Sequence, residues 1–326
     1  MRTVYIKEFG GPEQLEIREV AKPSPPESGE ILVRVAYAGL NRADLLQRRG
    51  LYPPPAGFDP HRPGLEFSGT VEQLGENVAG LSVGDKVCGI TAGEAQSDLL
   101  TIDHRLVAAA ELSLKDLGAV PEVFVTAHDA LYTQANLREG ETVLIHAAAS
   151  GVGLAAAQIA KAAGAKVIGT TRSPEKAEHL SGKYGNWFDQ LLVTDEGPNF
   201  ADIVLELGGA DVTLDLVGGD YFPENLKCAA EKGRIILIGL TAGRKAEFDL
   251  GAALSKRLTI RGTVLRSRSL EEKAAAMEAF RSEIVPQLGK AFRPVIDKCF
   301  PIENVREAHE FLESNATLGK VLLVLG

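Results

Sequence analysis

The sequence has few cysteines, no long apolar run and no dense cluster of basic residues. Cys88, Cys228 and Cys299 are too few and too scattered for a disulfide framework, and no C-x-x-C pair is present to nucleate a zinc or redox site. We therefore expect a protein of a reducing compartment. The first 13 residues lack the apolar core of a secretory signal, so we expect a cytoplasmic location. Polar residues interrupt the longest small-apolar stretch, 147–169, which predicts no membrane association.

The charge balance is acidic. The 326 residues include 35 Lys and Arg against 44 Asp and Glu, which gives a formal net charge of −9. The longest basic patch covers only residues 47–49, so we expect no nucleic-acid partner. At about 150 residues per domain the length predicts two domains.

The pattern of elements changes near residue 121. Before it, short β-branched runs separated by Gly and Pro predict a mostly β domain with one short helix at 41–47. After it, apolar strands alternate with helices, which is typical of an α/β fold with a doubly wound parallel sheet. The strands are expected at 142–146, 166–171, 190–194, 212–217, 234–240 and 258–264, and the helices between them at 152–163, 174–183 and 221–231.

The last 60 residues predict two charged helices, 270–280 and 302–312, and an apolar terminal strand at 320–325. That strand has no free place in the six-stranded parallel sheet. We therefore expect residues 122–265 to form a cofactor domain, and residues 1–121 and 266–326 together to form the other domain.

A phosphate-binding loop is predicted where H-A-A-A-S-G-V-G, residues 146–153, joins a strand to a helix. The three small positions of a Rossmann-type dinucleotide fingerprint fall at Ala148, Ser150 and Gly153. Backbone amides at a helix start favour a pyrophosphate. The cofactor-binding candidates of this loop are Ala149, Ser150, Gly151, Val152 and Gly153. The alternative is a tight turn that binds no ligand.

The end of the second strand bears on the choice between NAD and NADP. No carboxylate occupies this position; Arg172, Ser173 and Lys176 instead offer two cations and a hydroxyl, which suit a 2′-phosphate. We therefore predict NADPH. The alternative is a solvated Arg172 with Ser173 as a helix cap, and Asp195 after the third strand would repel a phosphate.

Several motifs in order along the whole chain resemble one known family. They are N-R-A-D at 41–44, R-G-L-Y at 49–52, P-G-L-E-F-S-G at 63–69, V-G-D-K-V at 83–87, P-E-V-F-V-T-A at 121–127, A-S-G-V-G at 149–153 and L-R-S-R-S at 265–269. The sequence resembles the zinc-free quinone oxidoreductase family of the medium-chain dehydrogenase/reductase superfamily, most of all its tumour-suppressor-inducible and zeta-crystallin-like members. The resemblance implies a Rossmann domain, a GroES-like catalytic domain and a homodimer joined through the strand 258–264.

The same resemblance bears on the metal. Zinc-dependent relatives carry a Cys and a His where this sequence has Asn41 and Leu65, and they carry a Cys cluster that is absent here. The six histidines show no ligand spacing either, so we predict no metal site. Without a Lewis acid the hydride acceptor must itself be electron-poor, as a quinone or an enone is.

The resemblance also implies site residues. It places Asn41, Asp44 and Tyr52 beside the nicotinamide and the acceptor, as catalytic candidates. Asn41 with Asp44 could instead be a structural helix cap, and Tyr52 could stabilise an oxyanion or only line the pocket. Further cofactor-binding candidates, each of which could equally be packing or surface, are Thr126, Gly239, Leu240, Leu265 and Lys320.

Three functions follow from these expectations. The first is an NADPH-dependent quinone reductase, and the second an NADPH-dependent reductase of α,β-unsaturated carbonyls. The third is a non-enzymatic NADPH-binding protein like the lens crystallins of this family. The sequence does not determine which quinone or enone is the acceptor, because acceptor choice depends on the shape of the pocket.

Overall fold

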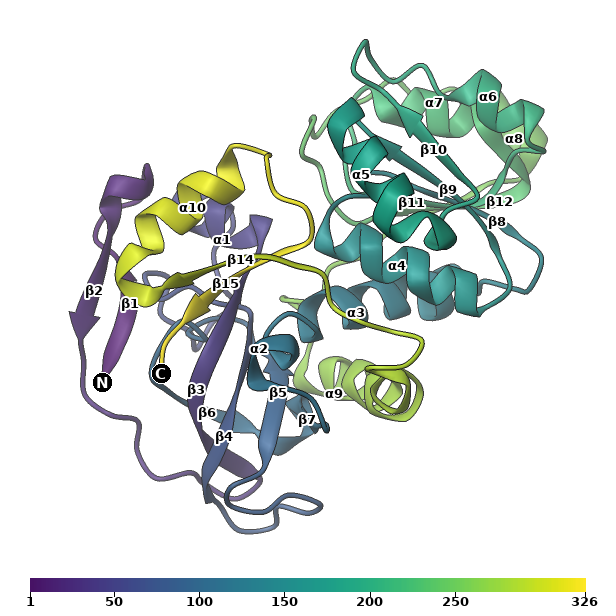
Figure 1. The fold of residues 1–326 in the computed structure, drawn as a ribbon. Helices are drawn as coiled ribbons and strands as arrows, with labels where there is room; N and C mark the ends of the chain where they lie inside the picture. The colour runs from purple at the N-terminus through teal and green to yellow at the C-terminus, as the bar shows by residue number, and fades with distance from the viewer. The chain divides into compact units, whose positions relative to one another are not determined.

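A computed structural model describes residues 1–326 and divides the chain into two compact units. Unit 1 comprises Met1–Val125 and Leu265–Gly326, and unit 2 comprises Thr126–Val264. Both chain ends therefore lie in unit 1 (Figure 1). No helix of either unit is long and apolar enough to cross a membrane.

Unit 1 is built on a seven-stranded sheet with the order β14-β15-β3-β4-β5-β7, in which β6 also pairs with β3; β1 and β2 form a separate hairpin. The strands are β1 (Arg2–Ile6), β2 (Leu15–Glu19), β3 (Glu30–Leu40), β4 (Glu66–Leu74), β5 (Lys86–Ile90), β6 (Leu99–Asp103), β7 (Val107–Ala109), β14 (Ile296–Pro301) and β15 (Lys320–Val324). The helices that begin in this unit are α1 (Arg42–Arg48), α2 (Leu114–Leu117), α3 (Pro121–His128), α9 (Leu270–Ala279) and α10 (Val305–Glu313). The long strand β3 organises the sheet because it pairs with β15, β4 and β6.

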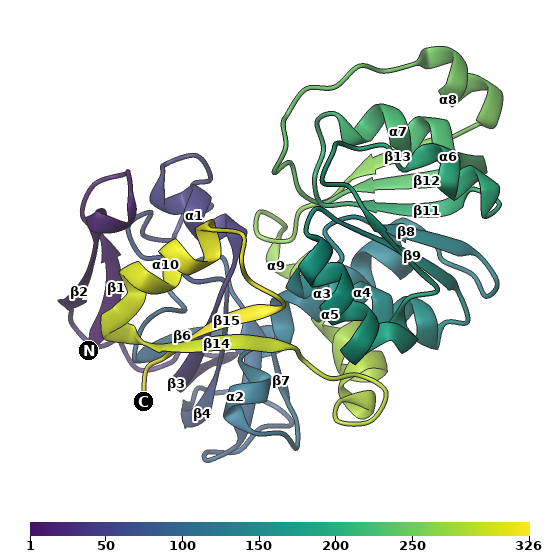
Figure 2. The same cartoon turned by 45° about the horizontal axis from the view of Figure 1, so that its top comes forward.

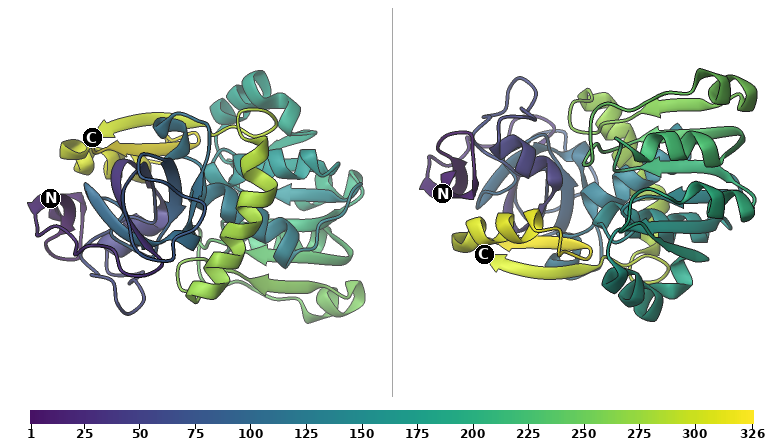
Figure 3. Two further views of the ribbon diagram at one scale, coloured as in Figure 1. Left: turned by 90° about the horizontal axis from the view of Figure 1, so that it is seen from below. Right: turned by 90° about the horizontal axis from the view of Figure 1, so that it is seen from above.

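The C-terminal strand β15 is an inner strand of this sheet. Its first four residues are buried, as the apolar sequence K-V-L-L-V requires. It pairs antiparallel with β3, so that Val321 lies opposite Leu40. This register places Lys320 beside the end of β3, where α1 begins. Figure 3 shows both chain termini among the strands of this unit.

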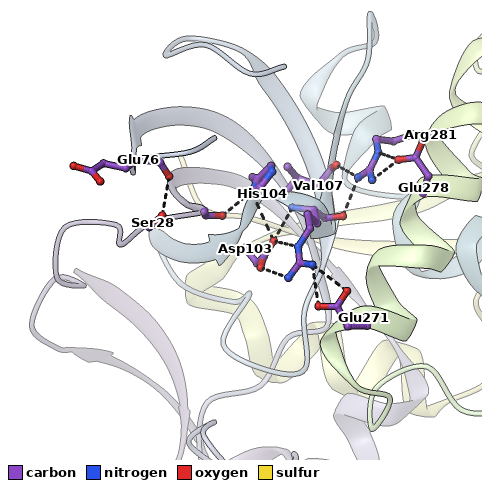
Figure 4. Close-up of polar contacts among 10 residues, drawn as sticks. Ser28, Glu76, Asp103, His104, Val107, Glu271, Glu278 and Arg281 are labelled. Carbon is purple, nitrogen blue, oxygen red and sulfur yellow. Dashed lines mark hydrogen bonds and ion pairs between the residues drawn. The ribbon is translucent and has the colours of Figure 1, made fainter. Parts of the chain in front are cut away.

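Two arginines attach the segment around α9 to the edge of the same sheet (Figure 4). The Arg281 guanidinium donates to the carbonyl oxygens of Arg105 and Val107, at 2.8 and 2.9 Å. Arg105 in turn pairs with Asp103 and with Glu271 of α9, both at 2.9 Å. Residues far apart in the sequence are therefore joined in one unit.

Unit 2 contains a six-stranded parallel sheet with the order β10-β9-β8-β11-β12-β13. Its strands are β8 (Thr142–Ile145), β9 (Lys166–Thr171), β10 (Gln190–Val193), β11 (Ala210–Asp215), β12 (Ala229–Leu237) and β13 (Thr259–Gly262). Its helices are α4 (Gly151–Ala162), α5 (Pro174–Tyr184), α6 (Ala201–Glu206), α7 (Tyr221–Cys228) and α8 (Leu250–Lys256). Helices α4 and α5 lie on one face of the sheet, and α6, α7 and α8 on the other (Figure 2). The strand order reverses between β8 and β11, where doubly wound sheets bind ligands.

Some expected elements differ from those observed. The helix expected at 221–231 ends at Cys228, because Ala229 already pairs with Ala210 as the first residue of β12. Strand β12 ends at Leu237, not at residue 240. The sequence analysis did not identify α6, α8 or β14 by position. In β14 the second and third residues, Asp297 and Lys298, are exposed and charged, so the strand does not appear in the sequence as a buried apolar run.

Candidate active site

A buried ammonium group forms the centre of a polar cluster in unit 1. Lys320 Nζ lies 2.5 Å from the Glu66 carboxylate, and the two residues are 4% and 0% exposed. Lys320 also donates to the Leu40 carbonyl and to Asn41 Oδ1, both at 2.8 Å. Asn41 Nδ2 donates back to Glu66 at 3.0 Å. Both ends of the Asn41 amide are therefore engaged within the protein.

Asp44 anchors the start of α1 beneath this cluster. Its carboxylate accepts hydrogen bonds from the backbone N–H of Asn41 at 2.7 Å and of Gly64 at 3.0 Å. The first bond is the reciprocal contact of a capping box. Burial raises the pKa of Asp44 to about 6, while those N–H groups and the cations Arg266 and Lys320 oppose the rise. Asp44 therefore joins the loop at Gly64 to the start of α1.

Arg266 fixes the position of Tyr52. Its guanidinium lies 5.0 Å from the centre of the Tyr52 ring and donates to the Tyr52 carbonyl at 2.8 Å. It also donates to the Ala92 carbonyl at 2.7 Å and to the Gln47 side chain at 2.5 Å. Burial raises the pKa of the Tyr52 hydroxyl above its ordinary value, so Tyr52 stays protonated. Arg266 thus contacts both the backbone and the ring of Tyr52, and the hydroxyl keeps its proton.

The predicted phosphate loop of unit 2 follows β8 at the reversal of strand order. Ser150 caps α4 by accepting from the Gly153 N–H at 3.1 Å. A Cβ at Gly153 would lie 2.6 Å from the Ala147 carbonyl, so only glycine fits there. Ala147 has a φ of +49°, which is an unusual backbone conformation for a residue with a Cβ. The N–H groups of Gly151 and Val152 have no acceptor within the helix and can bind an anion.

The other loop candidate of the sequence analysis, Ala149, is buried behind this turn.

A buried hydrogen-bonded chain supports the same edge of the sheet. His146 accepts from the Thr170 hydroxyl at 2.9 Å and donates to Asn225 Oδ1 at 2.6 Å. Asn225 donates to Asp215 at 3.0 Å, and Asp215 accepts from the Val217 and Gly218 N–H groups. Burial lowers the pKa of His146, so the ring is neutral. The chain links the phosphate loop to the turn after β11.

The groups expected to select the cofactor lie at the ends of β9 and β10. Arg172 is exposed and its side chain forms no ion pair. Ser173 caps α5 by accepting from the Lys176 N–H at 3.2 Å. Thr171 and Val193 are paired residues of the two strands, so Arg172 and the exposed Asp195 follow them at one edge. A cation and an anion therefore lie at the same edge of the sheet.

The remaining cofactor candidates are distributed over both units. Thr126, partly buried in α3, is the first residue of unit 2. Gly239 follows β12, donates to the Asp215 carbonyl at 3.2 Å and is too close to Leu216 for a side chain. Leu240 is 48% exposed. Leu265 and Lys320 belong to unit 1.

Comparison with known proteins agrees with these features. Residues 27–136 match the family described as "Alcohol dehydrogenase GroES-like domain", and residues 151–282 match "Zinc-binding dehydrogenase". The quinone oxidoreductase of Pseudomonas aeruginosa is 34% identical over 330 residues, covering 99% of each chain. The chain belongs to the quinone oxidoreductase family of the medium-chain dehydrogenase/reductase superfamily. It is therefore an oxidoreductase, as the sequence motifs predicted.

Solved structures extend the comparison. The Escherichia coli quinone oxidoreductase complexed with NADPH has a TM-score of 0.85 at 29% identity and covers all of both chains. The CurK enoyl reductase has a TM-score of 0.87 at 27% identity and covers 100% of this chain and 99% of its own. The predicted α/β fold with its GroES-like part is confirmed.

The name of one matched family implies zinc, but the side chains of this quinone oxidoreductase relative do not suit that ion. No group of three His, Cys, Asp or Glu side chains is arranged to hold a metal. Asn41 and Leu65 offer an amide and an aliphatic chain, which are poor zinc ligands. The Asn41 oxygen and Glu66 are already bonded to the Lys320 ammonium, which would repel a cation.

Sequence reasoning missed Glu66, Arg266 and His146 as supports of the candidate site. A signal was present for Glu66, because an acidic residue inside the buried-looking stretch P-G-L-E-F-S-G needs a partner of opposite charge. The sequence did not identify that partner.

Proposed function

We propose that this quinone oxidoreductase family member reduces a quinone with hydride from NADPH and uses no metal. The Lys320–Glu66–Asn41 cluster carries the proposal. In this cluster the Lys320 ammonium neutralises the Glu66 carboxylate and donates a hydrogen bond to the Asn41 amide oxygen at the start of α1. A site without a Lewis acid needs an acceptor whose own oxygens take up the charge, and a quinone meets this requirement.

Unit 2 supplies the proposed cofactor site. The open N–H groups of Gly151 and Val152 would bind the pyrophosphate, and Gly239 and Leu240 would lie toward the nicotinamide. The nicotinamide supplies hydride when it is bound. Arg172 and Lys176 support NADPH over NADH, since a 2′-phosphate pairs with cations.

Unit 1 supplies the proposed acceptor site. Tyr52, held by Arg266, would donate its hydroxyl to the oxygen that becomes negative as hydride arrives. Asn41 and Asp44 would act by positioning, because their polar atoms already bond to Lys320, Glu66 and the backbone.

An assay of cofactor oxidation tests the proposal. The protein should oxidise NADPH much faster in the presence of 1,4-benzoquinone than in the presence of a simple aldehyde of similar size, because the quinone is the more electron-poor acceptor and its own oxygens take up the charge. Equal rates with both acceptors would contradict it.

Reduction of an α,β-unsaturated carbonyl is a second candidate, favoured by the similarity to an enoyl reductase. The chemistry differs in where hydride arrives, which is the β-carbon of the alkene in an α,β-unsaturated carbonyl and the conjugated dione in a quinone. A short alkenal assayed beside the quinone under the same conditions separates the two, because the physiological class should show the larger kcat/KM.

We further propose that the two units act as an acceptor domain and a cofactor domain, and that two chains form a homodimer in the cytoplasm. Strand β13 supports the dimer, since it ends the sheet and is largely exposed. Leu250, Leu254 and Val264 near it are exposed apolar side chains.

A further inference from the structure

Unit 1 brings three carboxyl groups into the polar cluster, and two of them are fully occupied. Asp44 accepts one backbone N–H on each oxygen. Glu66 accepts from Lys320 and Asn41 on one oxygen and from the Glu122 N–H on the other, at 3.0 Å. Both residues are 0% exposed. Neither carboxyl has room for a further partner.

Glu122 is the third and differs from the other two. It is the second residue of α3, and its backbone bonds directly to Glu66. Its side chain is partly buried, and its carboxyl group forms no hydrogen bond or ion pair in the structure. The two carboxyl oxygens of Glu122 are also not fully enclosed by protein. Glu122 is therefore open on one side.

Its surroundings favour the neutral acid. Burial, followed by the negative charge of Glu66, raises the pKa of Glu122 to about 8, with a smaller contribution from Asp44. Lys320 and Arg266 oppose the rise without cancelling it. The titratable groups that face Glu122 are Glu66 on β4, Asp44 on α1, Lys320 on β15, Tyr52 in the loop after α1, Arg266, and Lys273 on α9.

The proposed function, on which this inference rests, needs a proton. Hydride transfer to a quinone leaves an anionic oxygen, and the hydroquinone forms only when a proton joins that oxygen. A carboxylic acid whose pKa lies near the working pH is an efficient donor.

We propose that Glu122 is the proton donor of the acceptor site. The O–H bond of its carboxyl group breaks, and an O–H bond forms on the reduced acceptor, with no change in the oxidation state of Glu122. The carboxylate that remains is stabilised by Lys320 and Arg266. Water then returns a proton through the open side of Glu122.

The neighbouring groups are weaker candidates. Tyr52 is a poorer acid, because burial raises its pKa above that of an ordinary phenol. The Lys273 ammonium donates to the Arg266 carbonyl at 3.3 Å and is buried. Asp44 has both oxygens bonded to backbone donors.

Single-turnover reduction of 1,4-benzoquinone by the NADPH-loaded protein, followed between about pH 6 and pH 10, tests the role. We expect the wild-type rate to fall above about pH 8, by about tenfold for each further pH unit. Glu122→Gln should lower the rate below pH 8 by about 100-fold and abolish this fall, since an amide donates no proton. Tyr52→Phe should keep the fall, and Glu111→Gln, an exposed carboxyl in the same unit, should match wild type.

Glu122→Gln that keeps both the rate and the alkaline fall would overturn the assignment while leaving quinone reduction intact. Loss of the fall in Tyr52→Phe would also overturn it, in favour of the tyrosine. No turnover by wild-type protein would contradict the proposed function itself, and the donor role with it. If Glu122→Gln does not fold, Glu122→Asp gives the test. Its shorter acid should lower the rate and shift the pH above which the rate decreases.

Discussion

The Lys320 ammonium and the Glu66 carboxylate form a buried ion pair at 2.5 Å, although the two residues are far apart in the sequence. The strand β15 brings Lys320 to this position through its pairing with β3. A buried pair stabilises only while both charges are present, because either charge alone would be buried without compensation.

Lys320→Met should therefore lower the free energy of unfolding by about 3–5 kcal/mol, measured by urea denaturation. The double variant Lys320→Met with Glu66→Gln should recover part of this loss, because no uncompensated charge remains. Equal losses in the single and double variants would show that the pair itself is not the source of the effect.

His309 should make the fold sensitive to acid. It is fully buried in α10, with Nε2 unbonded, and burial beside Arg48 lowers its pKa to about 3. In the unfolded chain this histidine has a pKa of ~6.5, so below that pH it binds a proton that it does not bind in the folded chain. Stability should therefore fall as the pH drops from about 6.5 toward 3, by at most ~1.4 kcal/mol per pH unit.

The variant His309→Leu removes this titration. The difference in unfolding free energy between wild type and variant should change across that pH range, whereas a constant difference would contradict a neutral buried His309.

Arg172 and Lys176 should determine the preference for NADPH. A charge-assisted contact contributes about 1.5–3 kcal/mol, so changing both residues to Ala should weaken NADPH binding by at least ~10-fold and NADH binding little. Fluorescence titration with both cofactors measures this. The matched control changes Lys166 and Lys183, at the start of β9 and in the last turn of α5, to Ala.

Equal binding of NADH and NADPH by the unmodified protein would mean that Asp195 outweighs the two cations. Raised salt should reduce the NADPH preference of wild type, since exposed ion pairs are screened.

The outer edge of β13 should join two chains. The Thr263 N–H bonds to Leu237 of β12, so by alternation the Gly262 N–H faces the free edge. Gly262→Pro removes that donor, and we expect it to shift a dimer toward monomer in sedimentation at micromolar concentration. A wild-type protein that is monomeric under these conditions would contradict the dimer.

The sequence predicted the parts of the molecule that local patterns determine. Strands β8 and β9 were located within one residue, because inner parallel strands are continuous apolar runs. The tight turn between β8 and α4 was predicted because its small residues, strand and helix are adjacent in the sequence, whereas its phosphate-binding role stays a prediction. The cap of α1 by Asp44 follows from a spacing of three residues.

Contacts between distant segments could not be predicted. Lys320 bonds to Asn41 across 279 residues, and only the register of β15 on β3 brings them together. In the sequence, Glu122 looks like an ordinary acidic residue in the first turn of a helix. Its environment arises from four segments of the chain, so its raised pKa has no local signal in the sequence.

Metal-independent oxidation of NADPH by a quinone decides whether this site works without zinc. Chelator-treated protein, shown by elemental analysis to contain no zinc, should oxidise NADPH with 1,4-benzoquinone as fast as untreated protein. Stoichiometric zinc that is lost on chelation together with the activity, and restored together with it, would contradict the central claim.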